Sequence, residues 1–249
     1  MINQGKIWNY LLYAIGEIFL VVIGILIAVN IGSWEEEKKY RAVEISYFTN
    51  LKKDLFADII QLDSLIKITR KKELAAKKIK VKAKKRAIDS LYHFSRDMER
   101  LIFVSEFFPH QNTYNEMQNS GNFSLIQNEE IKIKLMNLNQ TYTLVDFEQS
   151  HNRNDYKTLL AVFEKHVNWA NFFNTDKRTH NKLKFDSVYI ENNYQLIASD
   201  IRNLLDDKTF VNSLLFTELN HGFYAPWFTD IKNELLEIVD LIDKEIERN

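Results

Sequence analysis

The chain has 249 residues, a formal net charge of −1 and no cysteine. This charge balance is not that of a general polyanion-binding protein, and the lack of cysteine excludes disulfides, thiol catalysis and cysteine-based zinc sites. Only six glycines and two prolines are present. Leucine, isoleucine, lysine, glutamate and asparagine dominate instead, so the composition predicts an all-α protein.

The most apolar run covers residues 11–31, LLYAIGEIFLVVIGILIAVNI, and contains one ionisable residue, Glu17. As a helix it would extend roughly 31 Å at about 1.5 Å per residue, which is enough to cross a hydrocarbon core of ~30 Å. Trp8 and Tyr10 precede the run and Trp34 follows it, at positions where aromatic rings favour the interface between lipid and water. The pattern predicts one transmembrane helix embedded in a lipid bilayer.

The predicted anchor divides the chain into a short tail over residues 1–10, the anchor over 11–34 and an extramembrane helical domain over 35–249. The main alternative is a cleaved signal peptide, whose apolar region is normally about 7–15 residues long and ends at a small-residue cleavage site. The run is longer than this, and Ala28-Val29-Asn30 matches such a site poorly. An uncleaved signal anchor is the favoured interpretation.

Basic residues near the two ends of the run leave its orientation open. Lys6 precedes it, whereas Lys38, Lys39 and Arg41 follow it behind three consecutive glutamates. Counting basic residues alone places the C-terminal side in the cytoplasm, whereas counting net charge places the N-terminus there.

Two stretches of the sequence carry a family resemblance. They are YAIGEIFLVVIGILIAVNIGSWEEEKK at residues 13–39, and TYNEMQNSG at residues 113–121 followed by LIQN at residues 125–128. They resemble the signature of an uncharacterised family of single-pass membrane proteins from Gram-negative bacteria, a domain of unknown function. Members typically have a longer, basic N-terminal tail. The resemblance implies an anchor in the bacterial inner membrane and a helical domain on its periplasmic side, and it supplies no activity.

Beyond the anchor, apolar residues recur at spacings of three and four, the heptad-like period of a helix with one buried face. The series consists of Phe48, Leu51, Leu55, Ile59, Leu62 and Ile66. We expect the anchor to continue directly into this long helix, as the first arm of a helical hairpin within a bundle.

Residues 70–86, RKKELAAKKIKVKAKKR, contain ten basic residues and one acid. Such a run can contact nucleic-acid phosphates or a lipid surface. Because no aromatic residues interleave with it, nucleic acid is not the expected partner, and a solvated hairpin tip or helix end is favoured. The alternation of Ile79, Val81 and Ala83 makes helix less well supported there. The candidate basic patch comprises Lys77, Lys78, Lys80, Lys82, Lys84, Lys85 and Arg86.

A return helix is expected from Ile88 to Phe108, ended by Pro109, because proline disfavours helical geometry in the residue before it. Thr113 with Glu116 matches a capping box for a short helix, which Gly121 would terminate in a left-handed conformation.

The second half of the chain predicts further helices, the first of them capped by Asn128. Residues 221–227, HGFYAPW, are interpreted as an aromatic loop, and a final helix is expected from about Thr229. Its apolar residues also have heptad-like spacing, so we expect it to pack beside residues 48–66 and return the C-terminus towards the membrane.

Glu17 is the strongest candidate for a functional residue, because an ionisable group inside a membrane helix usually faces protein rather than lipid. On a helical wheel Gly24 and Ala28 lie within about 20° of it and Gly32 within about 60°. Small residues at this spacing let a second helix approach closely. The face predicts docking on a second copy of the chain or on another membrane protein. The alternatives are a protonated Glu17 that only assists insertion, and a proton-carrying carboxyl group.

No catalytic motif is present, and neither a cofactor nor a metal is expected. Glu218 and His221 have the spacing of a di-iron ligand pair, but such a site needs two of these pairs and further carboxylates on facing helices, and chance is the favoured explanation of the spacing. The sequence thus predicts a non-enzymatic, membrane-anchored interaction or scaffold protein that forms a homo-oligomer or binds another membrane protein. The alternatives are an accessory subunit of an ion-driven membrane complex, and an extracytoplasmic ligand sensor that needs a partner for output.

Overall fold

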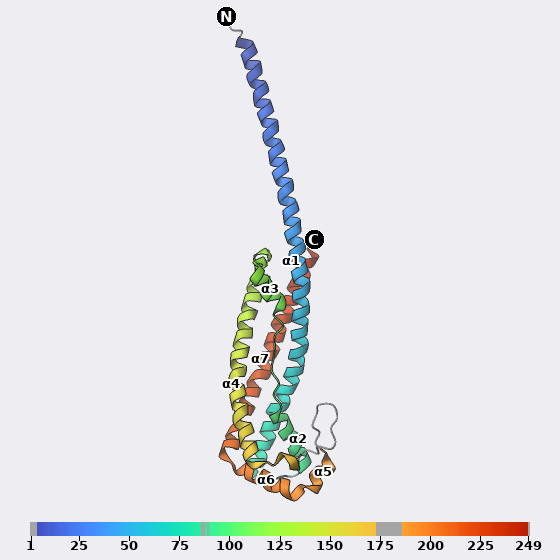
Figure 1. Ribbon diagram of the computed structural model, residues 1–249, viewed down its shortest axis with the longest axis vertical. Coiled ribbons are helices and arrows are strands. Elements are labelled where there is room, and N and C mark those ends of the chain that lie inside the picture. Colours follow the sequence, from blue (N-terminus) through green and yellow to red (C-terminus); the bar gives the residue numbers. More distant parts are fainter. Residues whose placement is uncertain (1–3, 86–87, 89, 173–185, 249) are drawn as a thin grey trace.

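The computed structural model describes the backbone of residues 4–85, 88, 90–172 and 186–248, with side chains from residue 13 onward (Figure 1). Within these residues there are helices and no strands, so the predicted all-α fold is confirmed. The α-helices are α1 (Gln4–Lys85), α2 (Leu91–Ile102), α3 (Asn112–Ser120), α4 (Glu129–His166), α5 (Ser187–Asn192), α6 (Tyr194–Asp206) and α7 (Lys208–Glu247). Two short 3-10 helices, η1 (Asn122–Leu125) and η2 (Trp169–Asn171), lie in the connections.

Helix α1 dominates the architecture, because it runs for 82 residues without a break, which corresponds to about 120 Å. Its N-terminal part projects alone from the bundle, and its C-terminal part is one of the long helices inside it (Figure 1). The end of α7 lies beside α1 where the projecting part begins (Figure 1). The expectation that the anchor helix continues directly into the bundle is confirmed.

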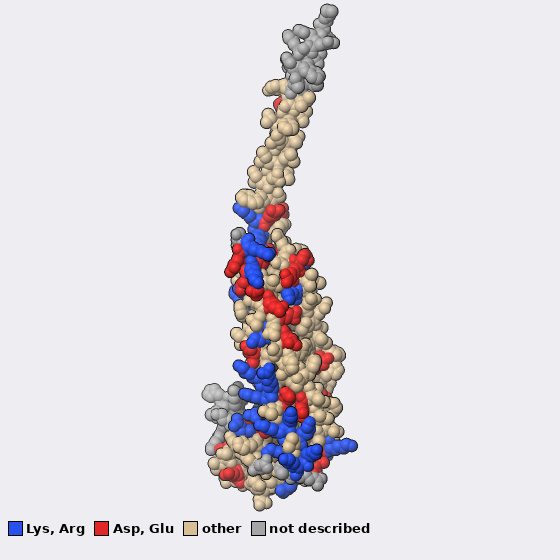
Figure 2. All heavy atoms as spheres, turned by 180° about the vertical axis from the view of Figure 1, so that it is seen from behind, with Lys and Arg blue, Asp and Glu red and all other residues tan. Residues whose placement is uncertain are grey.

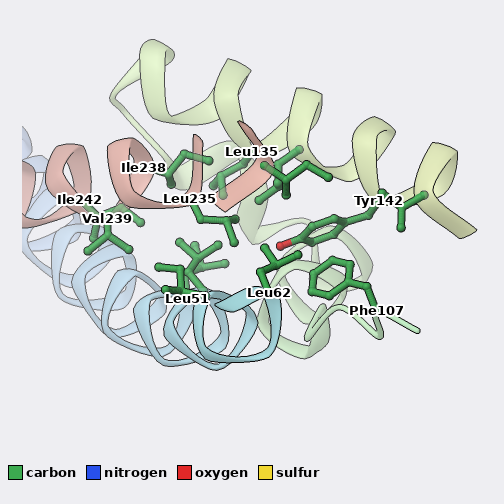
Figure 3. Packing of buried hydrophobic residues seen from close by; sticks show 14 of the residues in the cluster. Leu51, Leu62, Phe107, Leu135, Tyr142, Leu235, Ile238, Val239 and Ile242 are labelled. Atoms are coloured by element: carbon green, nitrogen blue, oxygen red, sulfur yellow. The ribbon is translucent and has the colours of Figure 1, made fainter. Parts of the chain in front are cut away.

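The half of the bundle nearer the projecting helix is built on α1, α4 and α7, which pack their apolar faces together (Figure 3). We call this cluster the proximal core. Its buried members include Phe48, Leu51, Leu55, Leu62, Phe107, Ile131, Leu135, Tyr142, Phe228, Leu235, Ile238 and Ile242. The prediction that the final helix packs beside residues 48–66 is therefore confirmed.

The far end of the bundle is closed by α2, α5 and α6, which cover the last turns of α1 and the start of α7 (Figure 1). We call this second cluster the distal core. It includes Ala76, Ile79, Phe94, Leu101, Phe163, Phe172, Ile197, Ile201, Leu204, Phe210 and Leu214. The two cores lie one after the other along α1.

The return helix predicted from Ile88 to Phe108 is shorter than expected, because α2 covers only Leu91–Ile102. The chain after α2 is non-helical up to Gln111, and side chains of other helices bind its backbone instead. Gln149 accepts a hydrogen bond from the Phe107 amide at 2.6 Å and donates one to the Phe107 carbonyl at 3.1 Å. The helix thus ends well before Pro109.

The predicted capping box is wrong. Thr113 lies inside α3, and the N-cap residue Gln111 makes no side-chain capping bond. The Thr113 amide instead donates to Asp54 Oδ2 at 3.0 Å. Two neighbouring predictions are confirmed. Gly121 ends α3 with φ 75°, and Asn128 caps α4 by accepting from the Glu130 and Ile131 amides.

Residues 221–227 are not a loop, and the final helix begins at Lys208 rather than near Thr229. Pro226 lies inside α7, where proline normally costs about 3 kcal/mol relative to alanine. Tertiary packing offsets this cost, because Tyr224 and Phe228 are buried in the proximal core and stack at a centroid distance of 5.7 Å. The Tyr224 hydroxyl also donates to the Glu148 carbonyl at 2.9 Å.

The basic stretch is helical through Lys85, so the weaker helical expectation at Ile79, Val81 and Ala83 is corrected. Ile79 and Ala83 are buried in the distal core, whereas Val81 is exposed. The buried pair has the four-residue spacing of one helical face.

Candidate functional site

The predicted membrane-docking face lies on the part of α1 that projects from the bundle. Glu17, Gly24, Ala28 and Gly32 are all exposed within the described structure. A methyl group added at Gly24 or Gly32 would meet no described atom within 4 Å. The helix places the carboxyl group and the small residues on one side, and that side has no partner in the described part of the chain.

Of the three predicted interface anchors, Trp34 is the one whose side chain the structure describes. Trp8 and Tyr10 lie within α1, but their side chains fall outside the described part. Trp34 is exposed, and the Lys38 ammonium nitrogen lies 3.6 Å from its ring centroid. This cation–π contact places a positive charge beside the aromatic ring at the end of the apolar run.

A group of polar residues, here called the collar, holds the bundle together where α1 leaves it. Arg41 Nη1 donates to Glu44 Oε2 at 2.7 Å, and Arg41 Nη2 donates to the Glu245 carbonyl. The buried Glu44 also accepts from the Gln127 amide at 2.9 Å, and Asn128 Nδ2 donates to Glu245 Oε2 at 2.8 Å. The collar therefore joins the last turns of α7 and the connection before α4 to the exit point of α1.

A second buried polar group, inside the proximal core, fixes the segment between α2 and α3. Asp58 is fully buried and accepts hydrogen bonds from the His110 amide at 2.9 Å and the Tyr142 hydroxyl at 2.6 Å. His110 Nδ1 lies 2.7 Å from Asp58 Oδ1. Burial, followed by the charge of Asp58 and its hydrogen bond, raises the pKa of Tyr142. The adjoining cavity of about 20 Å³ has room for one water molecule and not for an organic substrate.

The predicted basic patch occupies the last turns of α1. Lys77, Lys78, Lys84 and Lys85 are exposed, and Lys80 forms an ion pair with Glu218. Arg86 lies outside the described residues. The neighbour of Glu218 is therefore the Lys80 ammonium group. The basic patch lies on the solvated side of α1, and the other side of this helix packs in the distal core.

A groove between α1 and α2, here called the basic groove, has a volume of about 520 Å³. It is lined by Ile68, Lys71, Lys72, Arg96, Glu99, Arg100, Phe103 and Ser105. Figure 2 shows Lys and Arg side chains gathering over the lower part of the molecule, away from the projecting helix. The volume falls in the range of small-molecule sites, about 300–1,000 Å³.

Lys72 has an unusual position in this groove. It is 6% exposed, and it forms no ion pair with any carboxylate of the described residues. Burial lowers the pKa of Lys72 to about 8, against the opposing charge of Glu106. Glu106 in turn accepts from Arg153 at 3.0 Å. Because a buried ammonium group loses its hydration, an ion-pair partner is normally required to compensate it.

His221 lies on the other side of Lys72, and both residues line a small polar cavity of about 20 Å³. The Nδ1 atom of His221 is buried and has no hydrogen-bond partner in the described structure. Burial and the charge of Lys72 lower the pKa of His221 to about 3, so the ring is neutral at pH 7. Other charged groups at this cavity are Arg153 and Asp155 from α4.

The basic groove was not predicted from the sequence. Lys71 and Lys72 were counted within the basic stretch, but Arg96 and Arg100 come from a helix about 25 residues later, and no local spacing links them. The one available signal was the four-residue spacing of Arg96 and Arg100, which places both on one face of α2.

Together these features define a class: an all-helical protein with one N-terminal helix long and apolar enough, within the described residues, to cross a membrane. The particular family follows from the sequence profile that matches residues 17–193. The chain belongs to the Family of unknown function named DUF6090. This confirms the expectation of an uncharacterised family, and the match extends from inside the apolar run through α5. Comparisons with curated proteins and with solved structures found no match.

Proposed function

We propose that this protein is a membrane-anchored interaction protein, in which residues 11–34 span a bacterial inner membrane once. The anchor docks on a second copy of the chain or on another membrane protein through Glu17, Gly24 and Ala28. The observation that carries the proposal is that α1 begins at Gln4, 40 residues before the first buried residue, Glu44, and that its apolar run from residue 13 is covered by no described part of the chain.

The energetics of the docking face favour helix pairing. Lipid tails are as apolar as leucine, so helices in a membrane associate through close backbone approach and interhelical hydrogen bonds. Gly24 and Gly32 offer open backbone on the side where Glu17 lies. A second helix against this side would give the Glu17 carboxyl group a hydrogen-bond partner that lipid cannot supply.

The collar connects this face to the rest of the molecule. Because α1 is continuous and Arg41 ties it to the end of α7, a rotation of the anchor would be transmitted to the bundle as the rotation of one stiff helix. We propose that the bundle stands in the periplasm, and the resemblance of residues 13–39 supports this orientation.

The docking face can be tested by co-purification of the full chain carrying two different tags, expressed together and extracted in mild detergent. Gly24→Leu fills the space that a partner helix needs, so the differently tagged copy, or any other membrane protein that co-purifies, should be lost. Gly16→Leu is the matched control, because Gly16 lies about 100° around the helix from Glu17 and about 80° from Gly24. Unchanged co-purification with Gly24→Leu would contradict the proposal.

The absence of cysteine permits two further measurements. Ala28→Cys should form a disulfide-linked dimer in membranes if the partner is a second copy, whereas Leu26→Cys, on the opposite side of the helix, should not.

A third single-cysteine variant, Arg70→Cys, tests the orientation of the chain in the membrane. It should react with a membrane-impermeant maleimide once the outer membrane is permeabilised, and reaction only after lysis would contradict a periplasmic bundle.

A further inference from the structure

The geometry of the basic groove points to a ligand site: we infer that the groove between α1 and α2 binds a small organic anion through Lys71, Lys72, Arg96 and Arg100, with phosphate or carboxylate as the recognised group. This site is separate from the membrane-docking face. The two proposals can therefore fail independently.

The charge of the groove selects an anion. Four cationic side chains and one carboxyl group, Glu99, line it. Arg100 forms an ion pair with Asp97 at 2.7 Å, whereas Lys71 and Lys72 form none with the described residues. Arg96 lies over the Tyr92 ring, 5.9 Å from its centroid, and forms no ion pair with the described residues. Planar guanidinium groups bind phosphate and carboxylate through paired hydrogen bonds.

Lys72 supplies the second, independent observation. It is buried by more than nine-tenths, lines the groove, and has no ion-pair partner in the described structure. A packing role would be filled better by an apolar side chain of similar length, because burial disfavours the ammonium group more than the charge of Glu106 favours it. An anion in the groove would supply the missing counter-charge, which gives a physical reason for a lysine at this position.

The size and composition of the groove argue for a small ligand rather than a polymer. A volume of about 520 Å³ accommodates a molecule of metabolite size. Glu99 would repel a run of phosphates, but its carboxyl group can accept a hydrogen bond from a ligand hydroxyl or amino group. Ile68 and the half-exposed Phe103 offer an apolar surface beside the cations. Phe103 alone does not form the series of stacked rings that single-stranded nucleic acids require.

The position of the groove argues against the headgroups of the membrane in which the chain is anchored. From Ile31 at the end of the apolar run to Lys72, α1 rises roughly 60 Å at about 1.5 Å per residue. The expected ligand is therefore a soluble anion.

Calorimetric titration of the full-length protein in mild, uncharged detergent tests the inference, with pyrophosphate and citrate as probes. Saturable binding of at least one probe is expected at low salt. Lys72→Met and Arg96→Gln should each weaken it by about tenfold or more, the loss of one charge-assisted hydrogen bond. Arg70→Gln is the matched control: it removes the same charge from the exposed side of α1 that faces away from the groove, and it should change affinity by less than about twofold.

Three results would overturn the inference: no saturable binding of either probe, equal weakening by Arg96→Gln and Arg70→Gln, or binding that survives Lys72→Met unchanged. Parallel titrations with a single-stranded oligonucleotide and with phosphatidylglycerol vesicles separate the alternatives. Saturation by either of these without binding of pyrophosphate or citrate would replace a small-anion site with a polymer-binding or lipid-binding surface. Because Arg96 is exposed, its variant keeps the test valid if Lys72→Met fails to fold.

Discussion

The proximal core and the boundary with the distal core bury their polar groups in opposite ways. In the proximal core, Asp58 is fully buried and contacts the His110 amide, the His110 ring and the Tyr142 hydroxyl, all within 2.9 Å. At the boundary, Lys72 is buried without an ion-pair partner, and His221 Nδ1 without a hydrogen-bond partner, in the described structure. Asp58 and Lys72 lie on the same helix, α1.

Buried polar groups that have hydrogen-bond partners and buried polar groups that lack them have different roles. Satisfied buried polar groups fix a unique arrangement of helices, and Asp58 does this for the segment between α2 and α3. Buried polar groups without a partner lower the stability of the fold. Proteins keep such groups at functional sites, where a ligand supplies the partner. We therefore assign a structural role to the Asp58 group and a ligand-binding role to the Lys72 region. Substitutions in the two regions should have effects of opposite sign on stability.

The largest effect is expected from Asp58→Ala, which leaves the Tyr142 hydroxyl and the His110 amide without their acceptor. The free energy of unfolding should fall by about 3–5 kcal/mol, as for breaking one side of a buried charged network. Urea denaturation of the full-length protein in detergent measures it. Asp63→Ala on the same helix is the control, because its ion pair with Lys232 is half-exposed and should contribute about 0–1 kcal/mol. Equal losses in the two variants would remove the structural role assigned to Asp58.

The opposite sign is expected for Lys72→Met. The pKa of Lys72 falls from 10.5 to about 8 on folding, so below pH 8 the folded protein holds a proton that burial disfavours. Removing the charge should stabilise the ligand-free protein by roughly 3 kcal/mol at pH 7.

The pH dependence sharpens this prediction. Between pH 8 and pH 10.5 the unfolded chain binds more protons at Lys72 than the folded protein, so the wild-type protein gains stability as the pH rises. The advantage of Lys72→Met should therefore shrink towards zero near pH 10.5. The other charged groups around position 72 are present in both proteins, and their titration largely cancels in the difference: Lys71, Arg96, Glu99, Arg100, Glu106, Arg153, Asp155 and His221. A variant less stable than wild type at pH 7 would contradict the unpaired state of Lys72.

A smaller effect is expected from Asn128→Ala, which removes the cap of α4 and one contact of the collar. Losing an N-cap normally costs about 1 kcal/mol. Asn168, which caps η2 by accepting from Ala170, provides a comparison away from the collar. Thermal melting should show a larger loss for Asn128→Ala than for Asn168→Ala, because Asn128 also donates to Glu245. Equal losses would limit the role of Asn128 to capping.

The long helices could be predicted because their signal is local and repetitive. Residues 48–66 and the last turns of α7 keep one apolar face over many turns, and the proximal core uses that face. Gly121 and Asn128 were equally local, since each is a cap. The prediction failed at Pro226, where a residue that breaks isolated helices lies inside α7 because Tyr224 and Phe228 are held by the core.

The basic groove could not be predicted, because its chemistry depends on burial. Lys72 is one of three consecutive basic residues in the sequence, Arg70 to Lys72, yet Arg70 and Lys71 are exposed and Lys72 is not. Helical periodicity alone would assign Lys72 to the face of Ala76 and Ile79, but a lysine on such a face is ordinarily expected to reach solvent. Only the structure, in which α2 packs over this part of α1, shows that the Lys72 side chain does not reach solvent.

In the proposed site an anion supplies the counter-charge of the buried Lys72, and thermal unfolding with and without pyrophosphate tests this most directly. Lys72→Met should melt at a higher temperature than wild type without the anion, and pyrophosphate should raise the melting temperature of wild type by more than that of the variant. A variant that melts lower without the anion, and that responds to pyrophosphate as wild type does, would contradict the proposed site.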